Sequence, residues 1–426
     1  MRLQITNPGE HRPLFGLPWE RPLADWPDDL GLLDPGGLHR HVVRFFEHGD
    51  TTYVLKELPE SLAEREYRLL RRLVDAGIPA AESIGVVTDR GAANAGEGML
   101  VTRHLDFALT YRVLLSGRGL RIPFLGERLL DALVGLLARL HLIGFFWGDC
   151  SLSNTLFRRD AGALVAFVVD VETAELHRSL SDGQRAADLA IAVENIAGGL
   201  YDLQLAGHLA DGIDPFETAT SVDVRYHALW QELTAEEVVH AGEQFRIEQR
   251  FQRLHDLGFD VGELELTATG EGQRLRLVPR VVEIGYFGPR LAALTGLHTG
   301  ENQARRLLDD IRQFGVVLEQ RSGKHLPENI VATRWLDRVY EPTVAGIPAE
   351  LRERLEPAEL FHQILEHRWF MSEAAGVDIG IDVARESYVN DVLRYAPDEH
   401  IVIDPATVEL PVIRLDSPPE PPPGSG

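Results

Sequence analysis

The stretch FWGDCSLSNTLF at residues 146–157, followed by FVVDVE at residues 167–172, decides the fold of this chain. Asp149 is followed by Asn154 five residues later, and Asp170 closes an apolar run sixteen residues after Asn154. An Asp, an Asn and a second Asp in this order are the side chains that metal-assisted transfer of a phosphoryl group requires. The pattern therefore predicts a catalytic loop followed by a metal-binding strand.

Each of these side chains has a distinct expected role. Asp149 orients or deprotonates the attacking hydroxyl, while Asn154 and Asp170 hold the Mg²⁺ that neutralises charge on the phosphates. Glu172, two residues after Asp170, is a candidate ligand for a second metal ion. The expected reaction partners are a nucleotide and a hydroxyl acceptor of unidentified class, whether sugar, lipid headgroup, metabolite or protein.

The segments before this loop occur in the order that such a site demands. Leucines between residues 129 and 140 recur with helical spacing and lead into the loop. Further upstream, residues 51–58 form a β-type run with Lys56 near its end, and a helix is expected to begin with Ser61 as its cap. Lys56 would reach the nucleotide phosphates, and Glu66 on that helix would hold the lysine in place.

The scarcity of lysine supports this role for Lys56. The chain has 42 basic residues, of which only Lys56 and Lys324 are lysines. A planar guanidinium does not replace a compact ammonium that bridges a phosphate and a carboxylate, so an otherwise general preference for Arg would spare this position. The alternative is that Lys56 is a surface residue of an edge strand.

Residues 31 to about 205 resemble the protein-kinase-like superfamily. The resemblance is closest to the lipopolysaccharide (Kdo) kinase branch, which is related to the aminoglycoside and choline phosphotransferases. The segment Asp188-Leu189-Ala190 falls where the family often has an Asp-Leu-Ala segment behind the catalytic loop. The matched elements are Val54-Leu55-Lys56, Glu66, the hinge strand Met99-Leu100-Val101-Thr102, Gly148-Asp149 through Asn154, and Asp170-x-Glu172.

This resemblance implies an α+β, two-lobed fold with ATP in the cleft between the lobes. It implies that Lys56, Glu66, Thr102, Asn154 and Asp170 form the nucleotide-binding set and that Mg²⁺ is the metal cofactor. The catalytic pair would be Asp149 and Lys56, and the metal ligands would be Asn154, Asp170 and Glu172.

Two departures from the family pattern leave other functions open. Trp147 stands where the family usually has His or Tyr, although that position is more structural than chemical. The only candidate for a nucleotide-covering glycine loop is Asp34-Pro35-Gly36-Gly37, which is equally typical of a simple turn. One alternative is therefore a non-catalytic nucleotide-binding regulator whose C-terminal half is a protein-interaction module. The other is an enzyme that moves another group, such as AMP, from the same cleft.

The chain length predicts two to three domains. A turn-rich junction near residues 210–215 separates the kinase-like part from a second half that resembles a bacterial domain of unknown function, and that resemblance supplies no chemistry. The predicted division is an N-terminal segment at 1–30, a kinase-like domain at 31–212 with lobes at about 31–105 and 106–212, a mainly α-helical domain at 220–415, and a disordered Pro-rich tail at 416–426.

Within the second half, residues 301–311 and 356–367 have the pattern of amphipathic helices, and residues 275–282 have that of a strand. An acidic and histidine-rich cluster on the second helix is interpreted as a polar helix face or an interdomain contact rather than a metal site, because its two histidines are not four residues apart. A basic face is most typical of ion pairing, with an anionic substrate pocket as the alternative. The acidic and histidine-rich cluster comprises Glu359, His362, Glu366, His367 and Glu373, and the basic face comprises Arg246, Arg250 and Arg253.

Composition excludes several other classes of protein. The net charge of −24 argues against a nucleic-acid or anionic-membrane partner. Cys150 is the only cysteine, so an internal disulfide and a cysteine-based zinc site are excluded, and a small buried side chain is expected there. His141 is expected to be a core or supporting residue rather than a base. No apolar run approaches the ~20 residues of a membrane span and the N-terminus lacks a signal-peptide core, which together predict a cytoplasmic protein.

Overall fold

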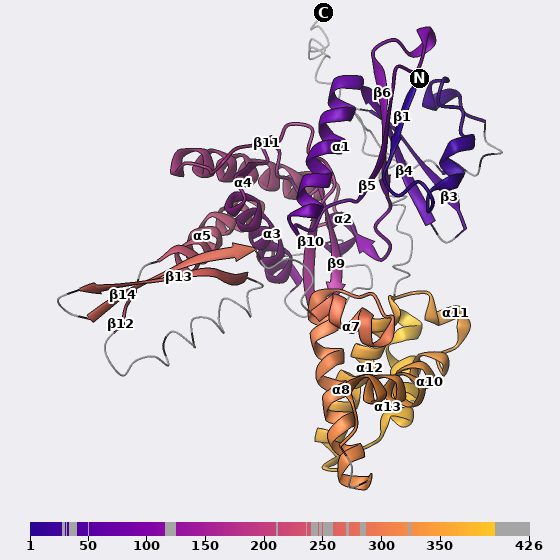
Figure 1. The fold of residues 1–426 in the computed structure, drawn as a ribbon, viewed down its shortest axis with the longest axis vertical. Helices are drawn as coiled ribbons and strands as arrows, with labels where there is room; N and C mark the ends of the chain where they lie inside the picture. Colours follow the sequence, from indigo (N-terminus) through magenta and orange to yellow (C-terminus); the bar gives the residue numbers. More distant parts are fainter. Residues whose placement is uncertain are drawn as a thin grey trace, which may run out of the picture.

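The computed structural model describes residues 1–27, 30, 32–33, 41–49, 51–115, 125–209, 212–235, 237–239, 246, 249, 259–269, 272–281, 287–322 and 325–396. A sheet-containing N-terminal lobe lies beside a helical lobe, and a separate group of helices formed by the C-terminal part lies below the two lobes (Figure 1). This α+β, two-lobed arrangement followed by a mainly helical part confirms the predicted fold class.

The N-terminal lobe is built on a six-stranded sheet in the order β1-β5-β6-β4-β3-β2, with all neighbours antiparallel. Helix α1 (Glu60–Asp75) packs against it through a buried stripe that includes Ala63, Tyr67 and Leu70. β4 lies between β3 and β6, so Lys56 is on a central strand rather than an edge strand. The strands are β1 (Arg2–Ile5), β2 (Leu32–Leu33), β3 (Val42–His48), β4 (Thr51–Pro59), β5 (Ser83–Thr88) and β6 (Glu97–Arg103).

The first residues of the chain belong to this lobe. β1 pairs with β5, and the indole rings of Trp19 and Trp26 pack beneath the sheet with Leu14. Leu14 lies on the 3-10 helix Arg12–Gly16, Trp26 directly follows the 3-10 helix Leu23–Asp25, and Trp19 lies between these two helices. A third 3-10 helix spans Ala92–Asn94 between β5 and β6. The N-terminal segment is thus a structural element of the sheet.

Helix α1 begins at Glu60 and not at the predicted cap Ser61. The pairing of β4 with β6 continues to Pro59, and the Glu60 N–H donates to Gly96 O at 2.9 Å. The helix therefore starts directly where the strand ends, and the Ser61 hydroxyl has no capping role.

The helical lobe surrounds the segment that carries the predicted catalytic loop. The leucines with helical spacing between residues 129 and 140 are all buried on α3, as predicted. A hairpin of β9 and β10 follows the loop and leads to Asp170. The elements are β7 (Ala108–Leu109), α2 (Tyr111–Leu115), α3 (Leu125–Leu142), β8 (Phe145–Phe146), β9 (Thr155–Asp160), β10 (Ala163–Val168), β11 (Glu175–Leu176), α4 (Asp182–Leu205) and α5 (Pro215–Thr234).

The helices on either side of the turn-rich segment at 210–215, α4 and α5, share one hydrophobic core. Ser181 and Gln184 form a capping box at the start of α4, and Asp214 caps α5, whose first residue is Pro215. The buried residues of α5, among them Val222 and Tyr226, belong to the same hydrophobic cluster as those of α3 and α4.

The C-terminal part begins with a three-stranded sheet in the order β12-β14-β13, formed by β12 (Glu237–Val239), β13 (Phe259–Thr269) and β14 (Gly272–Val281). The strand predicted at 275–282 is β14, whereas its partner β13 was not predicted. The helices predicted at 301–311 and 356–367 are confirmed as parts of α8 and α12. The helices are α7 (Phe287–Thr295), α8 (Glu301–Ser322), α9 (Glu328–Trp335), a π-helical stretch (Leu336–Tyr340), α10 (Glu341–Ala345), α11 (Ala349–Arg352), α12 (Pro357–Ala375), α13 (Ile381–Asp391) and a 3-10 turn (Leu393–Tyr395).

These helices have hydrophobic cores of their own. Trp335, Tyr340 and Phe361 pack edge to face or tilted in one core, and Leu360, Ile364 and Leu393 belong to a second. Among the helices of the described residues, none combines the length and the apolar character needed to cross a membrane.

Candidate active site

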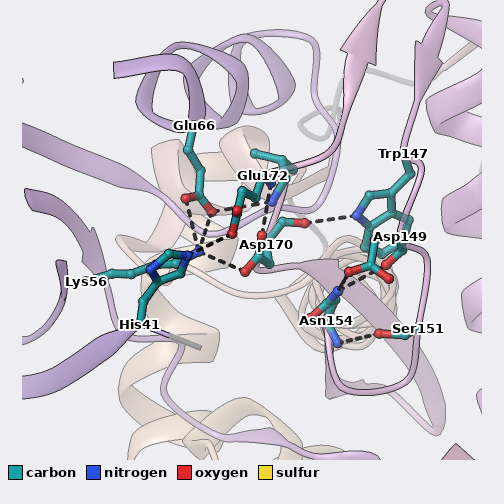
Figure 2. Close-up of polar contacts among 10 residues, drawn as sticks. His41, Lys56, Glu66, Trp147, Asp149, Ser151, Asn154, Asp170 and Glu172 are labelled. Atoms are coloured by element: carbon teal, nitrogen blue, oxygen red, sulfur yellow. Dashed lines mark hydrogen bonds and ion pairs between the residues drawn. The ribbon is translucent and has the colours of Figure 1, made fainter. Parts of the chain in front are cut away.

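Lys56 links the two lobes. Its ammonium donates to Glu66 Oε1 and Oε2 at 3.2 and 3.1 Å and to Asp170 Oδ2 at 2.8 Å (Figure 2). The lysine comes from β4, Glu66 from α1 and Asp170 from the segment after β10. The structure therefore brings together three residues that the sequence analysis had selected from widely separated segments.

Burial sets the charge balance of this triad. The side chain of Glu66 is 1% exposed, and burial raises its pKa to about 7, although the charge of Lys56 opposes that rise. For Lys56, burial favours a lower pKa, but the charges of Glu66 and Asp170 outweigh it and the pKa is raised. The ammonium is thus fully charged at neutral pH.

The predicted catalytic loop is held by two amide side chains. Asn154 Nδ2 donates to Asp149 Oδ2 at 2.9 Å and to Asp149 O at 3.0 Å, while Asn195 Nδ2 donates to Asp149 Oδ1 at 2.9 Å. The Ser151 hydroxyl accepts from the Asn154 N–H at 3.2 Å, which closes the turn. Burial raises the pKa of Asp149, and the charges of Asp170 and Glu172 add to the rise against the two amide contacts.

A fully buried carboxylate supports the loop from below. Asp188 on α4 accepts from the backbone N–H groups of Trp147 and Gly148, each at 2.8 Å, and faces His141 Nε2 at 3.1 Å. His141 also hydrogen bonds with the Tyr226 hydroxyl at 2.6 Å. His141 is therefore a supporting core residue, as predicted, and the Asp-Leu-Ala segment supplies the anchor of the loop.

Trp147 and Cys150 have structural positions. The Trp147 indole is buried and its Nε1 donates to the backbone oxygen of Asp170 at 2.9 Å, so it joins the loop to the segment that follows β10. Cys150 is fully buried, and burial raises the pKa of its thiol well above the ordinary value. Both observations confirm the interpretations made from the sequence.

Glu172 lies at the entrance of the cluster. Its carboxylate faces His41 Nε2 at 3.1 Å, and its N–H donates to Asp170 Oδ1 at 2.9 Å. His41 lies immediately before β3. The carboxylate of Glu172 is thus held close to Asp170 and is only 12% exposed.

The oxygen atoms of this site fit Mg²⁺ as a cofactor bound together with phosphates. Asp170 and Glu172 supply carboxylates, and Asn154 turns its amide nitrogen towards Asp149, which leaves its amide oxygen to face a cation. Mg²⁺ usually takes one or two carboxylates and completes its coordination with waters and substrate phosphates. Among the described residues, no group of three His, Cys, Asp or Glu side chains could hold a metal by itself.

The remaining predicted residues have different positions. Thr102 is buried on β6, where it pairs with Val54, two residues from the Leu100 that pairs with Lys56; its contact with a nucleotide stays a prediction. The candidate glycine loop at 34–37, the residues Arg250, Arg253 and Lys324, and the Pro-rich tail lie outside the described residues.

The acidic and histidine-rich cluster of α12 makes an interdomain contact. Glu359 Oε2 accepts from the Ala161 N–H at 3.2 Å, and His362 Nε2 lies 3.2 Å from an Arg306 nitrogen. His367 Nε2 hydrogen bonds instead with the Ser387 hydroxyl at 3.0 Å. The Glu359 contact confirms the interpretation of interdomain packing for this end of the cluster, while His362 and His367 contact residues of the C-terminal part.

Asn195 and His41 are the residues at the site that sequence reasoning missed. A signal for Asn195 exists, because it follows Asp188 by seven residues and so lies on the same face of α4, two turns later. No comparable signal marks His41.

Comparisons with known proteins match each half of the chain to a family model. Residues 36–193 match the model of the lipopolysaccharide kinase (Kdo/WaaP) family. Residues 36–193 are kinase-like. Residues 228–393 match a domain of unknown function, DUF4032, so the family resemblance of both halves is confirmed.

Two solved structures share low similarity with the chain. The structure described as WaaP in complex with acyl carrier protein is 18% identical with a TM-score of 0.37, covering 60% of this chain and 99% of that chain. The kinase domain of BubR1 is 13% identical with a TM-score of 0.29, covering 36% of this chain and 48% of that chain. No curated protein matches the chain.

Proposed function

We propose that the protein is an ATP- and Mg²⁺-dependent phosphotransferase that acts on a hydroxyl acceptor. The observation that carries this proposal is the convergence of Lys56, paired with Glu66 and Asp170, on the loop in which Asn154 contacts Asp149. Phosphoryl transfer needs a lysine for the phosphates, a carboxylate and an amide for the metal ion, and a separate carboxylate for the acceptor.

The nucleotide would bind through the charges of the Lys56 triad. Lys56 sits between two carboxylates, and its ammonium is the positive group available to the phosphates, with Glu66 as its fixed partner. When bound, Mg²⁺ supplies positive charge beside the phosphates, and Asp170, Asn154 and Glu172 would hold it. The buried position of Glu66 keeps the lysine in one orientation.

Asp149 would act on the acceptor. Both of its carboxylate oxygens accept from amide groups, of Asn154 and Asn195, which fixes the plane of the carboxylate without neutralising its charge. Its raised pKa makes it a stronger base than an exposed Asp, which suits a residue that receives the proton of a hydroxyl. The acceptor itself is proposed only as a hydroxyl compound, such as a sugar, lipid headgroup or metabolite.

Nucleotide binding is the first test of this function. A ligand present at about a hundred times its Kd stabilises the folded state by ~2.7 kcal/mol, so saturating Mg-ATP should raise the melting temperature of the full chain by several degrees. Asp170→Asn should reduce this rise, and Asp182→Asn, which lies on the exposed start of α4, should leave it unchanged. A melting temperature that does not respond to Mg-ATP would rule out both the enzyme and the nucleotide-binding regulator.

A further inference from the structure

A cavity of about 950 Å³ lies where the β9–β10 hairpin and α3 meet the C-terminal helices α8, α12 and α13. Figure 1 shows α7 and α8 directly beneath this hairpin. The volume is that of a site for a small organic ligand. None of the residues of the candidate active site lines this cavity, so the cavity is separate from that site.

Arginines from both parts of the chain line the cavity. Arg128 comes from α3, Arg158 from β9 and Arg306 from α8. Their contacts go to neutral groups: Arg128 donates to Gly162 O, Arg306 lies 3.2 Å from His362 Nε2, and the Arg158 guanidinium stacks 5.3 Å from the centre of the Phe167 ring. The charge of Arg158 also interacts with those of Asp160 and Glu356, whereas Arg128 and Arg306 contact a carbonyl and a histidine whose pKa burial lowers.

The carboxylates in the same wall have other tasks. Asp160 accepts from the N–H groups of Asn302 and Gln303 at 3.0 and 2.7 Å. This residue of the kinase-like part thus caps α8 of the C-terminal part. Glu301 accepts from two backbone N–H groups at the start of α7, and Glu359 accepts from Ala161 and from side-chain amides. Asp131 pairs with an arginine of α5, and Glu366 is the further acidic residue that lines the cavity.

Apolar side chains complete the lining. Phe167, Phe287 and Phe370 line the cavity, and the Phe370 side chain is 55% exposed on the solvent side. Guanidinium groups bind phosphate through paired hydrogen bonds, and aromatic rings bind an apolar body. In a chain with a net charge of −24, a wall with several arginines is a local exception that favours an anion.

We propose that this interdomain cavity binds a small molecule that carries a phosphate group on an apolar or aromatic body. The phosphate group would lie between Arg306 of the C-terminal part and Arg128 of the kinase-like part, so the ligand would bridge the two. The site is independent of the nucleotide cluster and of the transfer reaction proposed above.

Calorimetry of the full chain with phenyl phosphate as the probe tests this assignment. Each arginine contact to an anion contributes about 1.5 kcal/mol or more, so Arg306→Gln and Arg128→Gln should each weaken binding at least about tenfold. Arg312→Gln is the matched control, because Arg312 lies on the same helix, pairs with Asp309 and does not line the cavity. Inorganic phosphate should bind more weakly than phenyl phosphate by about tenfold or more, because it lacks the apolar surface.

Three results would overturn the proposal. They are no binding of phenyl phosphate to the wild-type chain, equal binding in wild type and both cavity variants, or binding that is lost in Lys56→Met and kept in Arg306→Gln. The last result would locate the anion at the nucleotide cluster. Because the two cavity variants lie in different parts of the chain, and Mg-ATP is titrated in parallel, a folding defect in one variant is distinguished from loss of the site.

Discussion

The replacement of Asp188 by Ala tests the support of the catalytic loop. The Asp188 carboxylate is fully buried and has three donors, the N–H groups of Trp147 and Gly148 and the ring of His141. Removal of the acceptor from a buried donor costs about 1–3 kcal/mol for each donor left unsatisfied. We therefore expect Asp188→Ala to lower the free energy of unfolding by about 4 kcal/mol.

The loop should lose its shape as well as its stability. Gly148 has a φ of 75°, a left-handed conformation that favours glycine, and its N–H is one of the two groups that Asp188 fixes. Asp149 follows directly, so its carboxylate would no longer be placed against the acceptor. We expect any transfer activity of Asp188→Ala to fall by orders of magnitude, even under conditions where the variant remains folded.

Urea denaturation measured by circular dichroism provides the assay. Wild type, Asp188→Ala and Asp182→Asn are compared, since Asp182 lies on the same helix but is 98% exposed and should change stability by less than ~0.5 kcal/mol. If Asp188→Ala unfolds within ~1 kcal/mol of wild type, the three contacts do not anchor the loop and the reasoning is refuted.

Three further changes test other parts of the structure. Lys56→Arg should reduce activity nearly as much as Lys56→Met, because the guanidinium must fit between Glu66 and the phosphates, whereas Lys324→Arg should be silent in the same assay; an active Lys56→Arg would refute the role of Lys56. Burial raises the pKa of Glu356 from 4.5 to about 7, so between these values the folded chain holds a proton that the unfolded chain has lost, and stability falls as the pH rises. Relative to wild type, Glu356→Gln should thus have a higher melting temperature at pH 8 than at pH 5. The corresponding gain in the free energy of unfolding is at most about 3 kcal/mol. A melting-temperature difference that is equal at the two pH values would contradict this. A chain that ends after α5 should fold and bind Mg-ATP, whereas one that ends near Gly212 should aggregate because it lacks α5; circular dichroism of both chains is the check.

The last of these changes follows from a revised domain boundary. Because α5 shares the hydrophobic core of α3 and α4, we propose that the kinase-like domain extends to about residue 234 and not to 212. A turn-rich segment such as 210–215 has the same composition whether it connects two helices of one domain or separates two domains. The packing of Tyr226 on α5 against His141 on α3 favours the first of these two arrangements.

The sequence was most informative where chemistry and periodicity coincide. The sequence pattern assigns Lys56 to a strand, Glu66 to a helix and Asp170 to the end of an apolar run. The structure brings these three side chains within hydrogen-bonding distance. The sheet of β12, β13 and β14 was missed, although residues 263–267 alternate acidic or polar and apolar side chains, because a single strand prediction does not identify its partner.

The contacts between the two parts of the chain were beyond prediction. Asp160 caps α8 from 142 residues away in the sequence, and Glu359 reaches Ala161 across 198 residues. No local pattern encodes such a pairing, since an acidic residue at a hairpin turn is ordinary. The interdomain cavity depends on these same pairings and is therefore also absent from the sequence pattern.

Mass spectrometry of the products formed from Mg-ATP and a cell extract tests the central claim most directly. The full chain is compared with Asp149→Asn, which keeps the shape of the side chain but cannot receive a proton from the acceptor. We predict that wild type adds a phosphoryl group to a hydroxyl compound and that Asp149→Asn forms this product orders of magnitude more slowly while it still binds Mg-ATP. Addition of AMP instead of a phosphoryl group, or equal product from both proteins, would contradict the proposed function.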